Sequence, residues 1–327
     1  MDTLTLPAVY VRHIADQVRA VGGDVARWLA MSGRRAADLD APLDLAGLQA
    51  LARDAIAITG EPALGLFVGE RLVATTHGML GYAAASSPTL RDALALFARF
   101  TAVRTSLLSI VLAPEPRALR VRFEETRPLG DLRRPFLEAV VLSVKNVLTA
   151  IAPGLRIAAV AFPFAAPDYA PLARRLLAAK LTYGARWAGF AVPASALDAP
   201  LRLADPDSFR EAAAVCQREL DKLTARETLT SRVRRLLLAP GGFPSLAITA
   251  RLLHMTPRTL HRRLLDEGTS YRGVLDDVRH ALALEHLRAG KRSLAEIADT
   301  LGYSDLANFR RAFKRWEAAP PSVVRKR

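Results

Sequence analysis

The side chains best suited to one specific chemistry are arginines, a histidine and an asparagine in the last third of the chain. Arg258, His261 and Arg262 form one group, and Asn308 and Arg311 form a second group further along. An arginine can donate two hydrogen bonds to the edge of guanine, and an asparagine can pair in a similar way with adenine. These residue types suit a protein that reads bases in the DNA major groove, so we take all five as candidate base-reading residues.

Further basic and hydroxyl-bearing side chains lie close to these candidates in the sequence. Such groups bind phosphate oxygens, which position a protein on DNA without reading the bases. The candidates for contact with the DNA backbone are Arg234, Arg235, Thr256, Arg263, Ser304, Lys314 and Arg315. The arginines of an arginine-rich helix more often simply face solvent. Their assignment as DNA contacts therefore depends on the elements that carry them.

The charge distribution also favours a polyanionic partner. The chain has a formal net charge of +14, from 46 Lys and Arg against 32 Asp and Glu. Residues 228–327 carry 19 basic against 9 acidic residues, whereas residues 1–227 carry 27 against 23. The excess charge therefore gathers at one end, which suits nucleic acid, although a membrane surface attracts the same charge.

Two segments place the candidate residues on helices. Residues 245–268 and 293–316 each begin with a serine, continue through a short helical pattern with a central alanine, turn, and enter an arginine-rich helix. This is the spacing of a helix-turn-helix unit, found twice. Thr256 with Pro257 is typical of a helix start, and Ser293 with Glu296 predicts a capping box.

A long helix is predicted between the two units. Residues 270–289 have an apolar period near 3.6 and are followed by Gly290. If the two arginine-rich helices lie about 34 Å apart, which is one turn of DNA, both enter successive major grooves. We therefore predict an all-α domain at residues 228–327, with helix-turn-helix units at about 246–267 and 293–316.

The first two thirds of the chain mix helical and strand patterns. We predict an α+β domain over residues 1–206 and a connecting helix and linker over 207–227, opened by a capping box of Ser208 and Glu211. The polar residues 224–228 would form the joint. Helical spacing covers residues 9–21, 45–59, 90–103 and 134–151, and strand patterns lie within 106–125, 156–164 and 187–193.

Several function classes find no support in the sequence. The chain has no nucleophile elbow, no phosphate-binding loop and no H-E-x-x-H motif. Cys216 is the only cysteine, which excludes an internal disulfide and a cysteine-based zinc site. No secretory signal and no apolar run long enough for a membrane span is present. We expect a cytoplasmic protein that is not an enzyme and needs no cofactor or metal.

Three residues outside the basic module have open interpretations. His13 and His77 are candidates for lining an effector pocket, although a core or surface position is more common for a histidine. Cys216 is a candidate redox sensor, although a buried structural cysteine is more common on such a helix. Effector-binding residues are otherwise unknown at this stage.

The last hundred residues resemble the AraC/XylS-type transcription regulators. The resemblance rests on MTPRTLHRRLLDEGTSYRGVLDDVRHALALEHL, on IADTLGYSDLANFRRAFKRW and on the closing PPSVVR. His254 and Ala318 stand where the family has glycine, Tyr303 replaces a phenylalanine, and Val323 with Val324 replaces a polar-aromatic pair. These departures concern turn and tail geometry and leave the candidate reading side chains in place.

The N-terminal part is similar to the arabinose-binding-like sensing domain of one AraC subgroup. The similar strings are GEPALGLFVGERL, HGMLGYAAASSPTLRDALALFARF and ALDAPLRLADPDS. The resemblance implies a bacterial regulator that binds double-stranded DNA, responds to a small-molecule effector and forms a homodimer, with RNA polymerase as a further candidate partner. It does not identify arabinose as the ligand.

Two alternatives remain beside an effector-controlled regulator. In the first, the N-terminal domain is a docking surface for a protein partner or a hidden enzyme, and docking is favoured because no catalytic set is visible. In the second, the chain packages DNA without reading its sequence, although Arg258 and Asn308 on the predicted reading faces argue against this.

Overall fold

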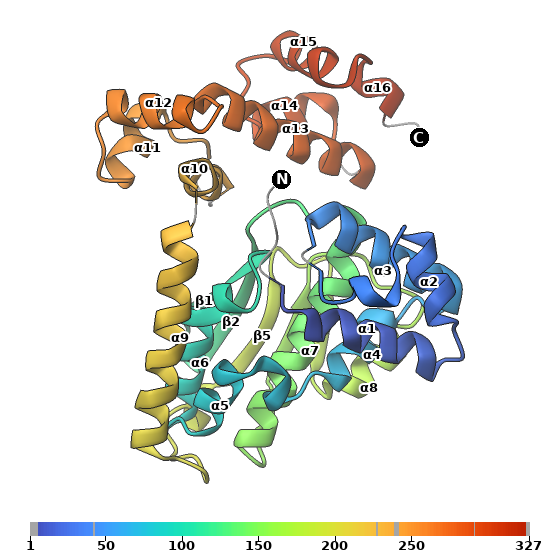
Figure 1. Ribbon diagram of the computed structural model, residues 1–327, viewed down its shortest axis with the longest axis vertical. Helices are drawn as coiled ribbons and strands as arrows, with labels where there is room; N and C mark the ends of the chain where they lie inside the picture. Colours follow the sequence, from blue (N-terminus) through green and yellow to red (C-terminus); the bar gives the residue numbers. More distant parts are fainter. Residues whose placement is uncertain (1–5, 42, 227, 239–241, 291, 325–327) are drawn as a thin grey trace. The chain divides into compact units, whose positions relative to one another are not determined.

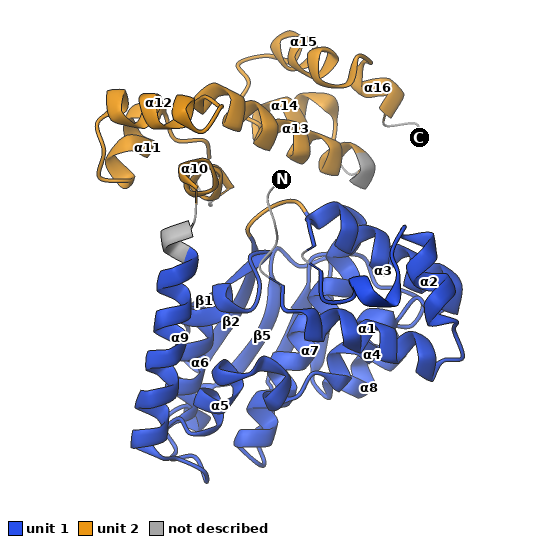
Figure 2. Ribbon diagram, in the orientation of Figure 1, with its two compact units in different colours: residues 1–125, 129–223 blue, residues 126–128, 224–327 orange. Residues whose placement is uncertain are grey.

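The computed structural model describes residues 6–41, 43–226, 228–238, 242–290 and 292–324. The chain divides into two compact units (Figure 2). Unit 1 comprises residues 1–125 and 129–223, and unit 2 comprises residues 126–128 and 224–327. Unit 1 combines helices with a sheet, and the described part of unit 2 is helical. The predicted class, an α+β domain followed by an all-α domain, is confirmed.

Unit 1 begins with a group of helices around an apolar core. The buried Trp28 lies in this core, and its indole nitrogen donates to the carbonyl oxygen of Leu51 over 2.8 Å. The predicted helices at residues 9–21 and 45–59 are confirmed. The helices of this part are α1 (Ala8–Ala20), α2 (Val25–Met31), α3 (Leu45–Thr59), α4 (Leu64–Arg71), α5 (Met79–Ala85) and α6 (Leu90–Phe100).

A five-stranded sheet forms the second half of unit 1 (Figure 1). Its strands lie in the order β1-β2-β5-β3-β4, with β3 and β4 parallel and the other pairs antiparallel. The helix α8 (Ala170–Leu177) makes the crossover between the parallel pair. The strands are β1 (Leu108–Pro114), β2 (Ala118–Glu125), β3 (Ala159–Phe162), β4 (Lys180–Tyr183) and β5 (Ala188–Pro193).

Helix α7 (Arg133–Ile151) joins the two halves of unit 1. It packs closely on α4, where a Cβ added at Gly65 would lie 2.3 Å from the carbonyl oxygen of Pro135. Gly69 approaches the carbonyl oxygen of Ala139 in the same way, at 2.6 Å. Only glycine allows the two backbones to approach so closely.

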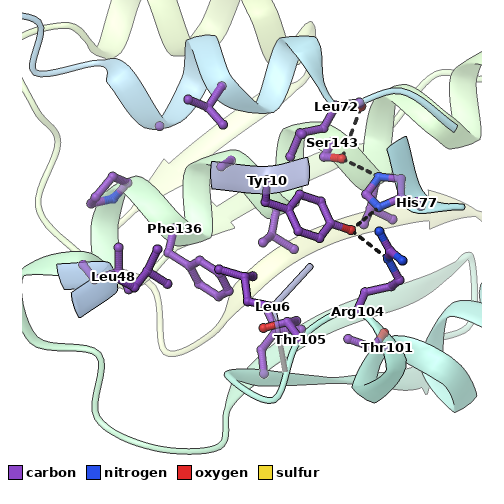
Figure 3. A pocket seen from close by; sticks show the side chains of 18 of the residues that line it. Leu6, Tyr10, Leu48, Leu72, His77, Thr101, Arg104, Thr105, Phe136 and Ser143 are labelled. Carbon is purple, nitrogen blue, oxygen red and sulfur yellow. Dashed lines mark hydrogen bonds between the residues drawn. The ribbon is translucent and has the colours of Figure 1, made fainter. Parts of the chain in front are cut away.

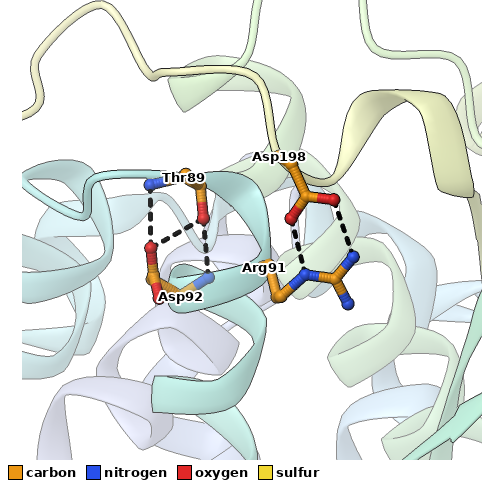
Figure 4. Close-up of polar contacts among 4 residues, drawn as sticks. All are labelled: Thr89, Arg91, Asp92 and Asp198. Carbon is orange, nitrogen blue, oxygen red and sulfur yellow. Dashed lines mark hydrogen bonds and ion pairs between the residues drawn. The ribbon is translucent and has the colours of Figure 1, made fainter.

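The start of α6 is fixed by two polar contacts (Figure 4). Thr89 caps the helix by accepting from the backbone N–H of Asp92, and the Asp92 carboxylate accepts from the Thr89 backbone N–H and hydroxyl. Arg91 donates two hydrogen bonds to Asp198, at 2.6 and 2.8 Å. The helix α6 is thereby held at a defined angle to the segment that follows β5.

Helix α9 (Pro206–Arg226) packs along unit 1 and leads toward unit 2 in the sequence. Its buried Ala212 and Cys216 belong to the core between the sheet and α6. The predicted capping box of Ser208 and Glu211 is wrong. The Asp205 side chain accepts from the N–H of Ser208, and the helix starts at Pro206, three residues earlier than the predicted first helical residue.

The predicted joint at residues 224–228 is also wrong in part, since α9 remains helical through residue 226. Residue 227 lies outside the described residues, and the next helix begins at residue 229. Only residues 227 and 228 separate α9 from α10 in the chain, so the connection is shorter than the predicted joint at residues 224–228.

Unit 2 consists of short helices around two small apolar cores. The long helix α13 is capped by Ser270 and ends at Gly290, whose φ of 65° is left-handed, so its predicted bounds are confirmed. The helices are α10 (Leu229–Leu238), α11 (Leu246–Leu252), α12 (Pro257–Asp266), α13 (Tyr271–Ala289), α14 (Leu294–Thr300), α15 (Leu306–Glu317) and α16 (Pro321–Val324).

Candidate nucleic-acid interface and ligand pocket

The first helix pair of unit 2 is α11 with α12. Ser245 caps α11 and Thr256 caps α12, each by accepting from a backbone N–H three residues later. Leu260 and Leu264 of α12 are fully buried, whereas Arg258, His261 and Arg262 are exposed. At 100° per residue, Arg262 lies directly opposite the buried stripe, with Arg258 close to it and His261 at its flank.

The second pair, α14 with α15, has the same plan. Ser293 and Glu296 form the predicted capping box, and Asp305 caps α15. Phe309 and Phe313 are fully buried on one side of α15. The opposite side carries the exposed Arg311 and Lys314, and the exposed Arg310, which the sequence analysis did not select, lies at the flank of the buried stripe.

A hydrogen-bond network orders the start of α15. The amide of the half-buried Asn308 donates to the Asp305 carboxylate over 2.6 Å and to the Ser304 hydroxyl over 3.0 Å. Arg311 donates to the Asn308 side-chain oxygen over 2.6 Å. The network brings two candidate base readers, Asn308 and Arg311, together on one side of the helix.

The turns within the two pairs share one backbone conformation. His254 has φ 55° and Gly302 has φ 69°, so both occupy the left-handed region. Ala318, after α15, has φ 54°. The two positions that lack the family's glycine therefore keep a glycine-like backbone, at a steric cost to His254 and Ala318.

The candidate backbone contacts fall into two groups. Arg315 is ion-paired with Asp276 at 2.7 Å, and Arg234 lies 3.6 Å from Asp277, both acids being on α13. These two arginines therefore hold α15 and α10 against α13. Arg315 is nevertheless exposed, as are the remaining candidates, Arg235, Thr256, Arg263, Ser304 and Lys314.

Helix α13 supports both pairs. Its first half contributes Tyr271, Val274 and Val278 to the core beneath α12, and its second half contributes Ala283 and Leu287 to the core beneath α15. One rigid helix thus passes from the first pair to the second within unit 2 (Figure 1).

Unit 1 contains a cavity of about 130 Å³ where its two apolar cores meet. Its walls come from α1, α3, α4, α6, β1 and α7. Most of the lining is aliphatic or aromatic, as in Leu48, Val68 and Phe97. Six polar side chains also line it, namely Tyr10, His77, Thr101, Arg104, Thr105 and Ser143.

Four of these side chains, Arg104, Tyr10, His77 and Ser143, form a series of hydrogen bonds at one end of the cavity (Figure 3). The Arg104 Nε donates to the Tyr10 hydroxyl over 3.1 Å, and that hydroxyl lies 2.9 Å from His77 Nδ1. The His77 Nε2 lies 2.8 Å from the Ser143 hydroxyl, which donates to the Leu72 carbonyl oxygen over 3.3 Å. Since Ser143 donates onward, His77 carries its proton on Nε2 and accepts from Tyr10 on Nδ1.

Burial determines which of these hydrogen-bonded side chains are charged. Burial, together with repulsion from Arg104 and His13, lowers the pKa of His77 from 6.5 to about 4. Burial also raises the pKa of the Tyr10 hydroxyl, although Arg104 opposes that shift. At neutral pH both groups are uncharged, and Arg104 is the cation of the pocket.

The structure places the other candidates as follows. His77 is buried and also lines the cavity, so it combines the core position and the pocket position that the sequence analysis left open. His13 is not among the lining residues. Cys216 is buried, and burial raises the pKa of its thiol, which favours the structural interpretation.

Tyr10, Arg104 and Ser143 were missed in the sequence. Tyr10 lies on α1, Arg104 between α6 and β1, and Ser143 on α7, so no local spacing connects them. A polar residue within an apolar helical stripe, such as Ser143 in α7, was the one available signal.

Among the described residues, no helix combines the length and the apolar character that crossing a bilayer requires.

Family models match both units of this chain. The family model for the arabinose-binding domain of AraC transcription regulators matches residues 22–201, and a helix-turn-helix domain matches residues 249–327. The chain is 34% identical to the ornithine utilization regulator of Pseudomonas aeruginosa over 98% of this chain and 96% of that protein. It is 28% identical to an uncharacterized helix-turn-helix regulator of Mycobacterium tuberculosis, with the same shares covered. Among solved structures, the regulator CdpR of Pseudomonas aeruginosa is 26% identical, with a TM-score of 0.46 over 92% of this chain and 96% of that one.

Proposed function

Because this chain belongs to the AraC-type DNA-binding transcription regulators, we propose that α12 and α15 read two successive major grooves and that a small molecule in unit 1 controls this binding. The observation that carries the first part is the repeated plan of unit 2. Each pair has a capped second helix that buries one apolar stripe and exposes arginines on the opposite face. A helix of this form presents its outward side chains to the groove.

The reading residues follow from that plan. Arg258, His261 and Arg262 would contact bases from α12, and Asn308 and Arg311 from α15. Arg235, Thr256, Arg263, Ser304 and Lys314 would contact phosphates. Arg234 and Arg315 would act partly through their ion pairs with α13, which hold the reading helices in place.

The cavity of unit 1 supports a small-molecule effector over a docked protein. Ligand sites are concave, mostly apolar and carry a few placed polar groups. The cavity has this form, and its polar end is already ordered by hydrogen bonds. A docked protein would instead need an exposed surface.

Helix α6 offers a route from the cavity to the DNA-binding unit. Phe97 of α6 lines the cavity, while Arg99 of the same helix donates to Gln217 of α9 over 2.7 Å. Since α9 precedes unit 2 in the chain, a shift of α6 on ligand binding would be transmitted to α9. The effector would act by favouring one of two states of this contact.

The relative from Pseudomonas aeruginosa is named for ornithine utilization, yet the cavity of this chain does not favour ornithine. Ornithine carries two ammonium groups, and ammonium groups in proteins pair with carboxylates. The described lining residues include no aspartate or glutamate. Ornithine is therefore a useful negative probe for this chain.

The test of DNA reading is to mix the full chain with sheared genomic DNA at about 0.15 M salt and to sequence what remains bound. We expect a shared motif of two half-sites one helical turn apart. Bound DNA without any enriched motif would favour the packaging alternative and contradict the proposal.

The test of effector control is a pair of matched substitutions. Val140→Trp would fill the cavity, and Val111→Trp places the same side chain on the exposed face of β1. We expect Val140→Trp to change the affinity for the selected DNA and to abolish its response to added small molecules. Equal behaviour of both variants would show that the cavity does not control DNA binding.

Three further features follow from the family alone. We propose a homodimer in the cytoplasm that contacts RNA polymerase at its target promoters. Sedimentation of the full chain, alone and with its selected DNA, would show whether one or two copies occupy the site.

A further inference from the structure

The cavity in unit 1 contains one positive charge and no negative one. Arg104 is the cation, and none of the described residues that line the cavity is acidic. Arg104 is half-buried, and its guanidinium lies over the Tyr10 ring, 5.3 Å from the centroid. A charge withdrawn from water in this way is costly unless an opposite charge compensates it.

The hydrogen bonds of Arg104 leave donors available. A guanidinium has five N–H donors. Its Nε donates to the Tyr10 hydroxyl, and one Nη donates to the Thr76 carbonyl oxygen over 3.0 Å. Among the described residues no carboxylate forms an ion pair with Arg104, so its remaining donors can serve a ligand.

The neighbours of Arg104 are neutral and occupied with one another. His77 is uncharged at neutral pH, and its two nitrogens are engaged by Tyr10 and Ser143. These groups order the polar end but add no second charge. A ligand with one negative charge would therefore match this end, and a ligand with two would leave one charge without a partner.

The rest of the cavity specifies the body of the ligand. Its remaining walls are aliphatic and aromatic side chains such as Leu64, Val68 and Phe136. The cavity volume of about 130 Å³ is slightly below that of an apolar cavity of about 150 Å³ that binds benzene, so it holds roughly six non-hydrogen atoms. This is the size of a short alkyl chain or a single aromatic ring beside the polar end.

We infer that the effector is a small apolar monocarboxylate, an alkyl or aryl acid, whose carboxylate binds Arg104 while its body lies against the apolar walls. The inference rests on the proposed role of this cavity as the effector site. A carboxylate suits a guanidinium because two parallel N–H donors match its two oxygens.

The test is calorimetric titration of the full chain with probes that share a carbon skeleton and carry a carboxylate, an amide or an ammonium head group. The aryl set is benzoate, benzamide and benzylamine, and the alkyl set is butanoate, butanamide and butylamine. We expect at least one carboxylate to bind roughly 10- to 100-fold tighter than its amide, and the amines to bind least.

Three arginine variants locate the effect. Arg104→Met should reduce carboxylate affinity to that of the amide and leave amide binding unchanged, which also shows an intact cavity. Arg104→Lys keeps the positive charge but lacks the two parallel N–H donors of the guanidinium, so it should retain a weaker preference for the carboxylate. Arg91→Met removes an exposed arginine that pairs with Asp198 outside the cavity, and should change nothing.

Two results would overturn the inference. An amide or amine that binds as tightly as its carboxylate would show that the cavity does not select an anion, while its role as effector site would stand. Failure of all six probes would also reject the monocarboxylate, and the comparison of Val140→Trp with Val111→Trp would then decide separately whether the cavity controls DNA binding.

Discussion

Arg262 and Arg311 occupy equivalent places, because each is the sixth residue of its helix and faces away from the buried stripe. We expect Arg262→Ala and Arg311→Ala each to weaken binding to the selected site by about 1–3 kcal/mol and to relax the preference at one half-site. Binding assays on sites altered in one half-site or the other would measure this. Full retention of sequence preference by Arg311→Ala would contradict the assignment of that face.

Lys314 gives the matched control for these arginines. It is exposed on α15 at the side suited to phosphate. Lys314→Ala should weaken binding to the selected site and to unrelated DNA by about the same factor, since phosphate contacts carry no sequence information. A loss of affinity for the selected site alone would show that Lys314 contacts bases and not only phosphates.

Replacing His254 or Ala318 with glycine should stabilise the chain, because both residues have a left-handed backbone. A residue with a Cβ in this conformation costs roughly 1–2 kcal/mol, which glycine avoids at some cost in chain entropy. We expect His254→Gly and Ala318→Gly each to raise the free energy of unfolding by about 0.5–1 kcal/mol, measured by urea denaturation. Ala281→Gly, within α13, should lower it by about 1 kcal/mol, and the opposite signs would refute the backbone argument.

At the scale of elements, Glu138 of α7 connects that helix to the start of α8. Its carboxyl accepts from the Tyr169 hydroxyl, with both oxygens at 3.0 Å. Burial raises the pKa of Glu138 to about 7 from an ordinary value of 4.5, although Tyr169 and Arg134 oppose the shift. Between these values the folded chain retains a proton that the unfolded chain releases, so the free energy of unfolding falls as pH rises through this window.

Glu138→Gln tests this contact. The variant keeps an acceptor for Tyr169 and cannot ionise, so it should match the wild type near pH 5 and exceed its unfolding free energy by up to about 3 kcal/mol near pH 8. His77 has the opposite dependence. Below pH 6.5 the unfolded chain binds a proton at His77 that the folded chain, with a pKa of about 4, does not bind, so the free energy of unfolding falls as pH falls. The His77 contribution is the same in both proteins, so it cancels when their free energies of unfolding are subtracted. A subtracted value that does not change with pH would contradict the prediction.

At the scale of the whole molecule, the charge asymmetry predicts how DNA binding depends on salt. Residues 228–327 hold most of the net charge of +14. If about six phosphates are neutralised, the logarithm of the binding constant should fall with the logarithm of salt concentration at a slope of about −5. Fluorescence anisotropy at several salt concentrations measures the slope, and Lys314→Ala should reduce its magnitude by about 1. A slope near zero would exclude a phosphate-based interface.

The sequence by itself determined the plan of unit 2 and its function class. Hydroxyl caps, turn residues and apolar periods are local signals, and each helix of the two pairs depends mainly on its own residues. The strongly periodic elements of unit 1, such as the helix at residues 45–59 and the alternating strand at 118–125, were predictable for the same reason.

The sequence did not predict α2, α4, α5, α8 or β4. These elements are short, and α4 contains Gly65 and Gly69, which weaken a helix by local propensity. Contact with α7 compensates, because the two glycines allow close packing between the helices. Such elements are stabilised by tertiary contacts, which a local pattern does not show.

Only the tertiary structure located the cavity and its charge. Tyr10, His77, Arg104 and Ser143 come from separate elements, and each is unremarkable in its own segment. Folding places them within hydrogen-bonding distance and removes them from water, which makes His77 neutral and leaves Arg104 as the single charge. Charge state and ligand preference depend on distances between elements, whereas caps and helix faces depend on neighbours in the chain, so the sequence determined the DNA-binding plan and the fold determined the pocket.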